Sequence, residues 1–146
     1  MKSRKVVSKI LTAAMICMSV SSLGMMVAEG AGNITDRQFG FNYHDASLQP
    51  VAVGSEAKWD YTSCYIYNRD SYQDIKVDVW ATNRTGSSYT LQENCNSDGT
   101  KTVRKGYEMY LPNYVKERGY GSCTLLIRPA GNYSTYIGGL WSPDSI

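Results

Sequence analysis

The sequence predicts an all-β protein: a compact antiparallel β-sandwich of about seven strands with one short helix, preceded by a cleaved signal peptide. Apolar and polar residues alternate in several segments between residues 38 and 141, as in strands with one buried face. The 12 Tyr and 3 Trp all lie beyond residue 30, and such aromatic enrichment favours strands over helices. Turn signals separate the alternating segments at short spacing, which is typical of small sandwiches.

Residues 1–30 have the composition of a secretory signal peptide. The first nine residues carry four basic side chains and no acid, and residues 10–27 carry no charge. Ala28 and Gly30 supply the small residues of a cleavage site. A membrane anchor is the alternative, but an uncharged run of about 18 residues diluted by serines lies at the lower limit for spanning a bilayer. We therefore expect a secreted domain at 31–146 and no stable membrane anchor.

Removal of the signal peptide changes the charge of the protein. The whole chain has 15 basic and 13 acidic residues, and four of the basic and one of the acidic residues lie in the first 30. The remaining domain has 11 basic and 12 acidic residues, a net charge near −1. Such a balance does not favour binding to nucleic acid or electrostatic binding to a membrane.

Three strands are expected in the first half of the domain. Residues 38–43 alternate aromatic with other side chains, residues 58–68 are dense in Tyr, and residues 74–81 alternate Ile and Val with polar residues. Residues 44–56 are polar and contain Pro and Gly, so we expect a loop there. The turn at residues 68–71 should join the second and third strands in a hairpin.

Four more strands are expected in the second half, at residues 88–95, 100–107, 120–128 and 133–141. Asp98-Gly99 favours a tight hairpin between the first two, because this dipeptide tolerates positive φ angles.

One short helix is expected over residues 112–118. Pro112 suits the first helical position, Lys116 and Arg118 lie in the last turn, and Gly119 follows the end. The segment allows two helical turns at most.

Two features near the ends of strands concern packing. Trp141 is too large and apolar to stay exposed, so we expect it to plug the core, with Ser142 and Asp144 in a turn behind it. Lys58 and Asp60 share one side of an expected strand. An ordered ion pair between them is one interpretation, but a weak surface pair is favoured.

Cys64, Cys95 and Cys123 remain after cleavage. Thiols outside the cell tend to pair, so we expect one disulfide and one spare thiol. Alternation allows each of the three to face the core, and all three pairings stay open. We favour the bridge Cys64–Cys95 and expect the spare thiol to be buried as a small hydrophobe.

No catalytic or metal-binding motif stands out. His44 is the only histidine, and it lies in a polar stretch without a neighbouring cysteine, which argues against Cys/His catalysis. One His and three Cys match a zinc site by count but not by spacing. Residues 94–99 resemble the first half of a calcium loop, but Lys105 stands where a glutamate is required. We therefore expect no enzyme activity, no cofactor and no metal.

Tyr65 and Tyr67 form the candidate binding surface. They share one side of their strand, opposite Cys64 and Ile66. An outward pair of tyrosines suits contact with sugar rings or with aromatic groups of a partner. The alternative is that Tyr simply suits a half-buried sheet.

Several motifs between Lys58 and the C-terminus resemble those of known proteins. They are K-x-D-x-T-S at residues 58–63, N-Y-V-x-E-x-G-Y at 113–120, and the closing G-L-W-S-P-D-S at 139–145. Together they resemble a group of uncharacterised small secreted proteins of gut Firmicutes. More remotely, the size, export signal and Tyr-rich strands are similar to those of lactococcin-type bacteriocins, which are small secreted β-sandwiches. Neither resemblance implies catalytic residues.

The expected function is that of a secreted, non-enzymatic binding or interaction protein, with a component of the cell surface or cell wall as its partner. The alternative is a bacteriocin-like secreted toxin. An enzyme is the third and least favoured class.

The first testable prediction concerns export. The protein recovered from the culture medium should begin near Ala31, because Ala28 and Gly30 are the suitably placed small pair. N-terminal sequencing of this material measures the cleavage site. A chain that still begins at Met1 and stays in the membrane fraction would contradict the prediction.

Overall fold

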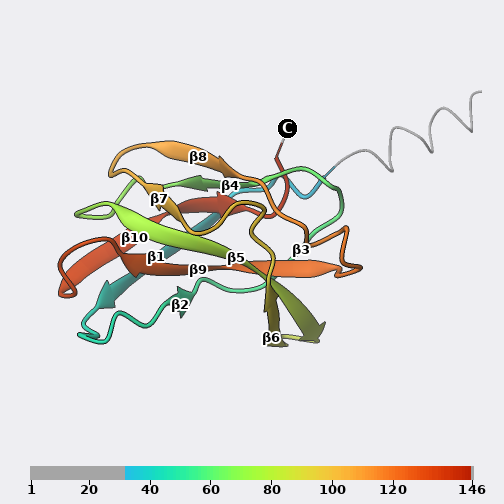
Figure 1. Ribbon diagram of the computed structural model, residues 1–146, viewed down its shortest axis with the longest axis horizontal. Helices are drawn as coiled ribbons and strands as arrows, with labels where there is room; N and C mark the ends of the chain where they lie inside the picture. The colour runs from blue at the N-terminus through green and yellow to red at the C-terminus, as the bar shows by residue number, and fades with distance from the viewer. Residues whose placement is uncertain (1–31, 146) are drawn as a thin grey trace, which may run out of the picture. The chain divides into compact units, whose positions relative to one another are not determined.

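The computed structural model describes residues 32–145, and these residues form ten strands in antiparallel sheets (Figure 1). The expected signal peptide at residues 1–30 lies outside the described residues. The strands are β1 (Arg37–Tyr43), β2 (Val51–Ala52), β3 (Glu56–Ala57), β4 (Cys64–Tyr67), β5 (Ile75–Thr85), β6 (Ser88–Asn94), β7 (Lys101–Val103), β8 (Glu108–Leu111), β9 (Ser122–Pro129) and β10 (Thr135–Ser142).

The strands belong to two sheets that share one hydrophobic core. The first sheet has four strands in the order β1-β10-β4-β8. The second has the order β2-β9-β5-β6, with β3 also paired to β9 and β7 also paired to β5. One of the sheets curls like half of a barrel. The all-β prediction is therefore confirmed.

Alternation along the strands supplies the core. In β5, Ile75, Val77 and Val79 are almost completely buried, and the residues between them are only partly buried. Ile66 and Trp141 from the four-stranded sheet belong to the same buried cluster. The core therefore lies between the inner faces of the two sheets.

The predicted helix at residues 112–118 is wrong, since residues 115–119 form a single turn and no helix occurs in residues 32–145. The Asn113 side chain accepts a hydrogen bond from the Val115 amide at 3.3 Å, which begins the turn. The Tyr120 amide donates to the Val115 carbonyl at 3.1 Å, and Gly119 has a φ of 84°, which ends it. The start and stop signals are both present, but they lie too close together for a helix.

The expected hairpin between residues 58–68 and 74–81 is also wrong. β4 pairs with β10 and β8, whereas β5 belongs to the other sheet. Asn68 lies fully buried at the crossing between the sheets. Its side-chain amide donates to the carbonyls of Gln73 and Val103 at 3.1 and 3.0 Å. These bonds satisfy the backbone where the chain changes sheet.

The Asp98-Gly99 hairpin is not formed either, because β6 and β7 both pair with β5 and lie end to end along one edge of it. The Asn96 side chain accepts the Val79 amide at 2.7 Å, in a place where a strand backbone would do so. A side chain thus bridges the gap that the turn leaves in the ladder. The short strands β2, β3 and β8 were not predicted, since they are too brief to show an alternating pattern.

Gly139 in β10 yields a prediction about stability. A Cβ at this position would overlap the backbone carbonyl of Tyr67 on the neighbouring strand β4. Gly139→Ala should therefore lower the free energy of unfolding by about 3 kcal/mol or more, because a backbone atom cannot move aside as a side chain can. Urea unfolding measures the change.

The matched control is Gly121→Ala, where an added Cβ meets nothing within 4 Å. It should leave the free energy of unfolding nearly unchanged. Equal effects of the two substitutions would show that the close approach of β10 and β4 is not as described.

Candidate binding site

The outer face of the four-stranded sheet carries tyrosines, of which Tyr65 and Tyr67 are half-buried and Tyr110 is exposed. Cys64 and Ile66 of β4 point into the core, so Tyr65 and Tyr67 point outward, as the sequence predicted. Antiparallel pairing sets Tyr65 of β4 opposite Tyr110 of β8, and their ring centroids are 5.7 Å apart. Tyr110 is 55% exposed, so its ring is accessible to a ligand.

A hollow of about 250 Å³ lies beside this tyrosine pair. Two tyrosines, three acidic residues, two serines and one isoleucine line it: Tyr65, Tyr110, Asp36, Glu108, Asp144, Ser142, Ser145 and Ile34. Tyr67 is not among the lining residues, although it shares the outward face of β4. The structure therefore brings one of the two predicted tyrosines into the hollow and adds residues from distant parts of the chain.

Hydrogen bonding orders the wall of the hollow. The Tyr65 hydroxyl donates to Glu108 Oε2 at 2.8 Å. Burial, followed by this hydrogen bond and the negative charges of Glu108 and Asp36, raises the pKa of Tyr65 to about 12. The phenol thus stays protonated, and the hollow presents two aromatic rings beside two exposed carboxylates.

A second tyrosine pair lies on the same sheet face. The ring centroids of Tyr72 and Tyr136 are 5.7 Å apart, and Tyr72 is 71% exposed. The Tyr136 ring lies so close over Gly40 and Gly138 that a Cβ at either glycine would collide with it. Tyr136 is six residues before Ser142 on β10, which corresponds to about 20 Å along the strand.

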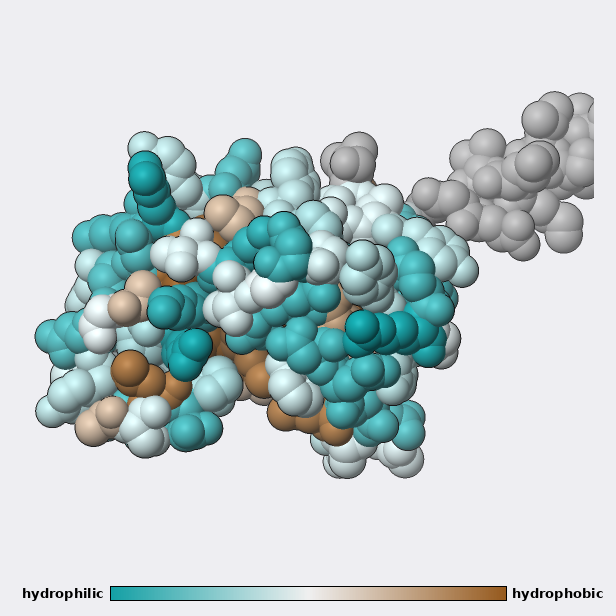
Figure 2. Space-filling model, viewed as in Figure 1, coloured by the Kyte–Doolittle hydropathy of each residue, from teal (hydrophilic) through white to brown (hydrophobic). Residues whose placement is uncertain are grey.

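The space-filling view shows how polar one face of the molecule is. Most of the visible face is hydrophilic, and hydrophobic residues form small separate patches (Figure 2). Such a face does not resemble the broad apolar surface of an obligate protein interface.

A buried ion pair lies under the end of the hollow. Lys58 and Asp144 are 1% and 0% exposed, and Lys58 Nζ is 2.9 Å from Asp144 Oδ1. Lys58 Nζ also donates to the carbonyls of Thr62 and Pro143, each at 2.7 Å. The ammonium group therefore has three acceptors, which use all three of its N–H bonds.

The second carboxylate oxygen of Asp144 is also hydrogen-bonded. Its Oδ2 accepts the Asn33 amide at 2.6 Å and the Trp59 amide at 3.0 Å. Burial by itself would raise the pKa of Asp144, but the hydrogen bonds from Lys58, Trp59 and Asn33 hold it below its ordinary value. The carboxylate stays charged although it is buried.

The expectation for Lys58 and Asp60 is thus corrected. Lys58 pairs with Asp144, a buried residue 86 positions away, and this is no weak surface pair. Asp60 instead accepts the Thr62 amide at 2.9 Å and closes the local turn. The prediction for Trp141 is confirmed: its side chain is 1% exposed, and the Ser142 hydroxyl donates to the Asp144 carbonyl at 3.0 Å.

The remaining sequence candidates do not assemble into a site. Nδ1 of the exposed His44 lies 3.1 Å from the Ser134 hydroxyl. The calcium-like stretch bonds within the sheet, since Asn96 contacts Asp78 and Val79. Residues 32–145 contain no group of three or more His, Cys, Asp or Glu side chains arranged to hold a metal ion. The same residues contain no helix long and apolar enough to cross a membrane.

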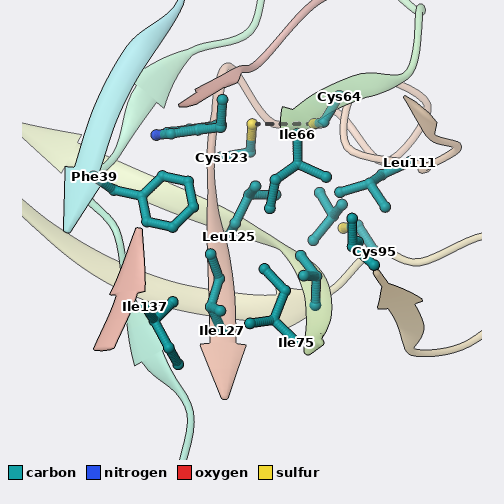
Figure 3. Close-up of a cluster of buried hydrophobic side chains, with 14 of the residues drawn as sticks. Phe39, Cys64, Ile66, Ile75, Cys95, Leu111, Cys123, Leu125, Ile127 and Ile137 are labelled. Carbon is teal, nitrogen blue, oxygen red and sulfur yellow. Dashed lines mark hydrogen bonds between the residues drawn. The ribbon is translucent and has the colours of Figure 1, made fainter. Parts of the chain in front are cut away.

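The three cysteines of the described residues are all fully buried thiols. The favoured bridge Cys64–Cys95 is not formed. The Sγ atom of Cys64 lies instead 3.9 Å from that of Cys123, which was one of the open pairings (Figure 3).

Fold and site together define a class: all-β proteins of two antiparallel sheets with an aromatic, acid-lined hollow on one outer face. A family model described as protein of unknown function (DUF2712) matches residues 25–145, so the chain belongs to this family. A comparison with curated proteins gives no match.

The buried ion pair yields a prediction about stability. Lys58→Met leaves Asp144 charged and buried without its partner, which should lower the free energy of unfolding by about 3–5 kcal/mol. Lys101→Met is the matched control, because it removes a lysine from the exposed pair with Asp98 and should cost less than about 1 kcal/mol. Urea unfolding at neutral pH compares the two variants.

Acidification should lower the free energy of unfolding of the wild-type protein through protonation of Asp144. The pKa of Asp144 is lowered in the folded state, so its contribution is present above the unfolded pKa and is lost as the pH falls through the folded pKa. In Asp144→Asn the free energy of unfolding should be lower at neutral pH and should fall less on acidification. Parallel acid profiles for both proteins would contradict this assignment.

Proposed function

We propose that the protein is an exported, non-enzymatic binding protein that holds an extended, uncharged glycan of a cell surface on the outer face of its four-stranded sheet. The observation that carries this proposal is the hollow formed by Tyr65 and Tyr110 and edged by Asp36 and Glu108. The export signal of the sequence supports an extracellular partner.

The chemistry of the hollow suits a sugar. A tyrosine ring offers an apolar face on which the C–H side of a sugar ring packs, and its hydroxyl adds a polar contact. The carboxylates of Asp36 and Glu108 and the hydroxyl of Ser145 supply acceptors for sugar hydroxyl groups. A ligand site of this kind joins apolar walls to a few fixed polar groups.

The arrangement of the tyrosines favours a long ligand. Tyr136 of the pair Tyr72–Tyr136 lies about 20 Å along β10 from Ser142, the residue opposite Tyr65 on β4. Gly40 and Gly138 have no side chains, so the Tyr136 ring lies directly against the backbone of the sheet. A polymer chain that follows the strands contacts both pairs, whereas a single sugar contacts only one.

The charge of the hollow argues against an anionic polymer as the ligand. The lining residues of the hollow that the structure describes include acids and no Lys or Arg. The domain after cleavage also has a net charge near −1. Phosphate-rich partners such as nucleic acids need the opposite sign.

Binding to cell-wall material tests the proposal. The purified protein should be retained by bacterial cell-wall preparations, and Tyr65→Ala combined with Tyr110→Ala should weaken retention by about tenfold or more, since central aromatic anchors carry most of the binding energy. Co-sedimentation at several protein concentrations gives the apparent affinity. Tyr133→Ala is the control, because Tyr133 is 50% exposed but does not line the hollow.

Two results would refute the proposal. One is the absence of retention on every wall fraction, and the other is equal retention of the double variant and the wild type. A growth-inhibition assay on the same samples examines the alternative, a bacteriocin-like secreted toxin. Inhibition without wall retention would favour that class.

A further inference from the structure

Two cysteines from facing sheets meet in the core. Cys64 is the first residue of β4 in the four-stranded sheet, and Cys123 lies in β9 of the other sheet. Their Sγ atoms are 3.9 Å apart, and both residues are fully buried (Figure 3). A disulfide requires an S–S distance of about 2 Å, so each sulfur has to move by about 1 Å.

We propose that Cys64 and Cys123 are oxidised to a disulfide that bridges the two sheets, and that Cys95 stays a thiol. Each of the two thiols loses its proton, the S–S bond forms, and the pair gives up two electrons. The oxidant is another disulfide, that of a thiol–disulfide oxidoreductase or of oxidised glutathione. Its S–S bond breaks, and it takes up the two electrons and two protons to become two thiols.

The surroundings of Cys95 explain why it is left out. Its Sγ atom lies 3.9 Å from the guanidinium group of Arg118. Figure 3 shows its sulfur apart from those of Cys64 and Cys123. Because a disulfide needs two adjoining sulfur atoms, the native fold gives Cys95 neither of these two sulfurs as a partner.

The bridge has to form before the core closes. In the folded protein, the hydrogen bond with Cys64 and the effect of burial raise the pKa of Cys123 well above its ordinary value. Thiol–disulfide exchange needs a thiolate and access to it, and a fully buried protonated thiol offers neither. The oxidant therefore acts on the chain during folding, as it leaves the cell. Only this choice of cellular oxidant rests on the export part of the proposed function.

The bridge has two structural consequences. It closes a loop between positions that are 59 residues apart, and such a loop restricts the unfolded chain. It also fixes Cys64, the neighbour of Tyr65, to the opposite sheet. The wall of the hollow is thereby attached to the core by a covalent bond as well as by packing.

Peptide mapping tests the proposal on the full chain. The chain is unfolded and reduced, refolded in a mixture of reduced and oxidised glutathione, treated with N-ethylmaleimide in denaturant, and digested with trypsin. The sequence places the cysteines in separate tryptic peptides, with Cys64 in 59–69, Cys95 in 85–101 and Cys123 in 119–146. Cys17 falls in the peptide 10–37 and is followed separately.

Mass spectrometry should find peptide 59–69 joined to peptide 119–146, and peptide 85–101 labelled by the maleimide. Cys95→Ser should keep the joined peptide, and Cys123→Ser should lose it. A reductant should lower the melting temperature of the wild type and of Cys95→Ser, but it should leave that of Cys123→Ser unchanged.

Two outcomes would overturn the proposal: a join between peptides 59–69 and 85–101, or full labelling of all three cysteines after refolding. The mapping needs no ligand, so a protein that binds no cell-wall material still gives the expected peptides. Failure of the glycan proposal and failure of the disulfide proposal are therefore distinguishable.

Discussion

The buried pair of Lys58 and Asp144 is the constraint on which one end of the molecule depends. A buried charge is tolerated only when it is paired and hydrogen-bonded, and here both conditions hold. The pair fastens the C-terminal segment to the loop that precedes β4 and, through Asn33, to the segment that precedes β1. Three parts of the chain thus meet at one carboxylate and one ammonium group, and a hydrogen bond from the Asp144 amide to the Asn33 carbonyl at 3.4 Å adds to the contact.

The outer face of the four-stranded sheet depends on this end of the molecule. Ser142 and Ser145 line the hollow beside Asp144, and the Ser145 amide donates to the Thr62 hydroxyl at 2.9 Å. Trp141, on the inner side of the same strand end, packs in the core. One short segment therefore closes the core on its inner side and lines the hollow on its outer side, so the stability of the fold and the shape of the hollow are coupled there.

Local patterns predicted the strands better than their partners. The alternation in residues 75–79 correctly placed Ile75, Val77 and Val79 inside, and the orientation of Tyr65 followed from the same period of two. Pairing was mispredicted because side chains intervene where turn residues favoured hairpins, as Asn68 and Asn96 show. Sequence rules for hairpins describe backbone turns. They do not include an amide side chain that makes the hydrogen bond of a missing strand backbone.

The candidate site was only half predictable for a related reason. Tyr65 and Glu108, which share a hydrogen bond, are 43 residues apart, and β8, which carries Glu108 and Tyr110, has only four residues. Lys58 and Asp144 are 86 residues apart, and both look like surface residues by type. Contacts of this range are set by the order of strands in a sheet. The order of strands depends on the whole fold, and it cannot be read from the alternation of apolar and polar residues within one segment.

The position of Tyr65 in the strand shows how such a fold orders the wall of the hollow that we propose as the glycan site. Cys64 and Ile66 on either side of it are both fully buried, so the backbone that carries the ring is fixed before and after Tyr65. Ordering a flexible aromatic side chain at the moment of binding costs free energy that subtracts from affinity. A ring whose backbone is already held, and whose hydroxyl is bonded to Glu108, has lost most of that freedom before a ligand arrives. Folding thus orders the wall of the hollow in the same step that buries the neighbouring residues in the core, and the cost of this ordering is met by folding instead of by ligand binding.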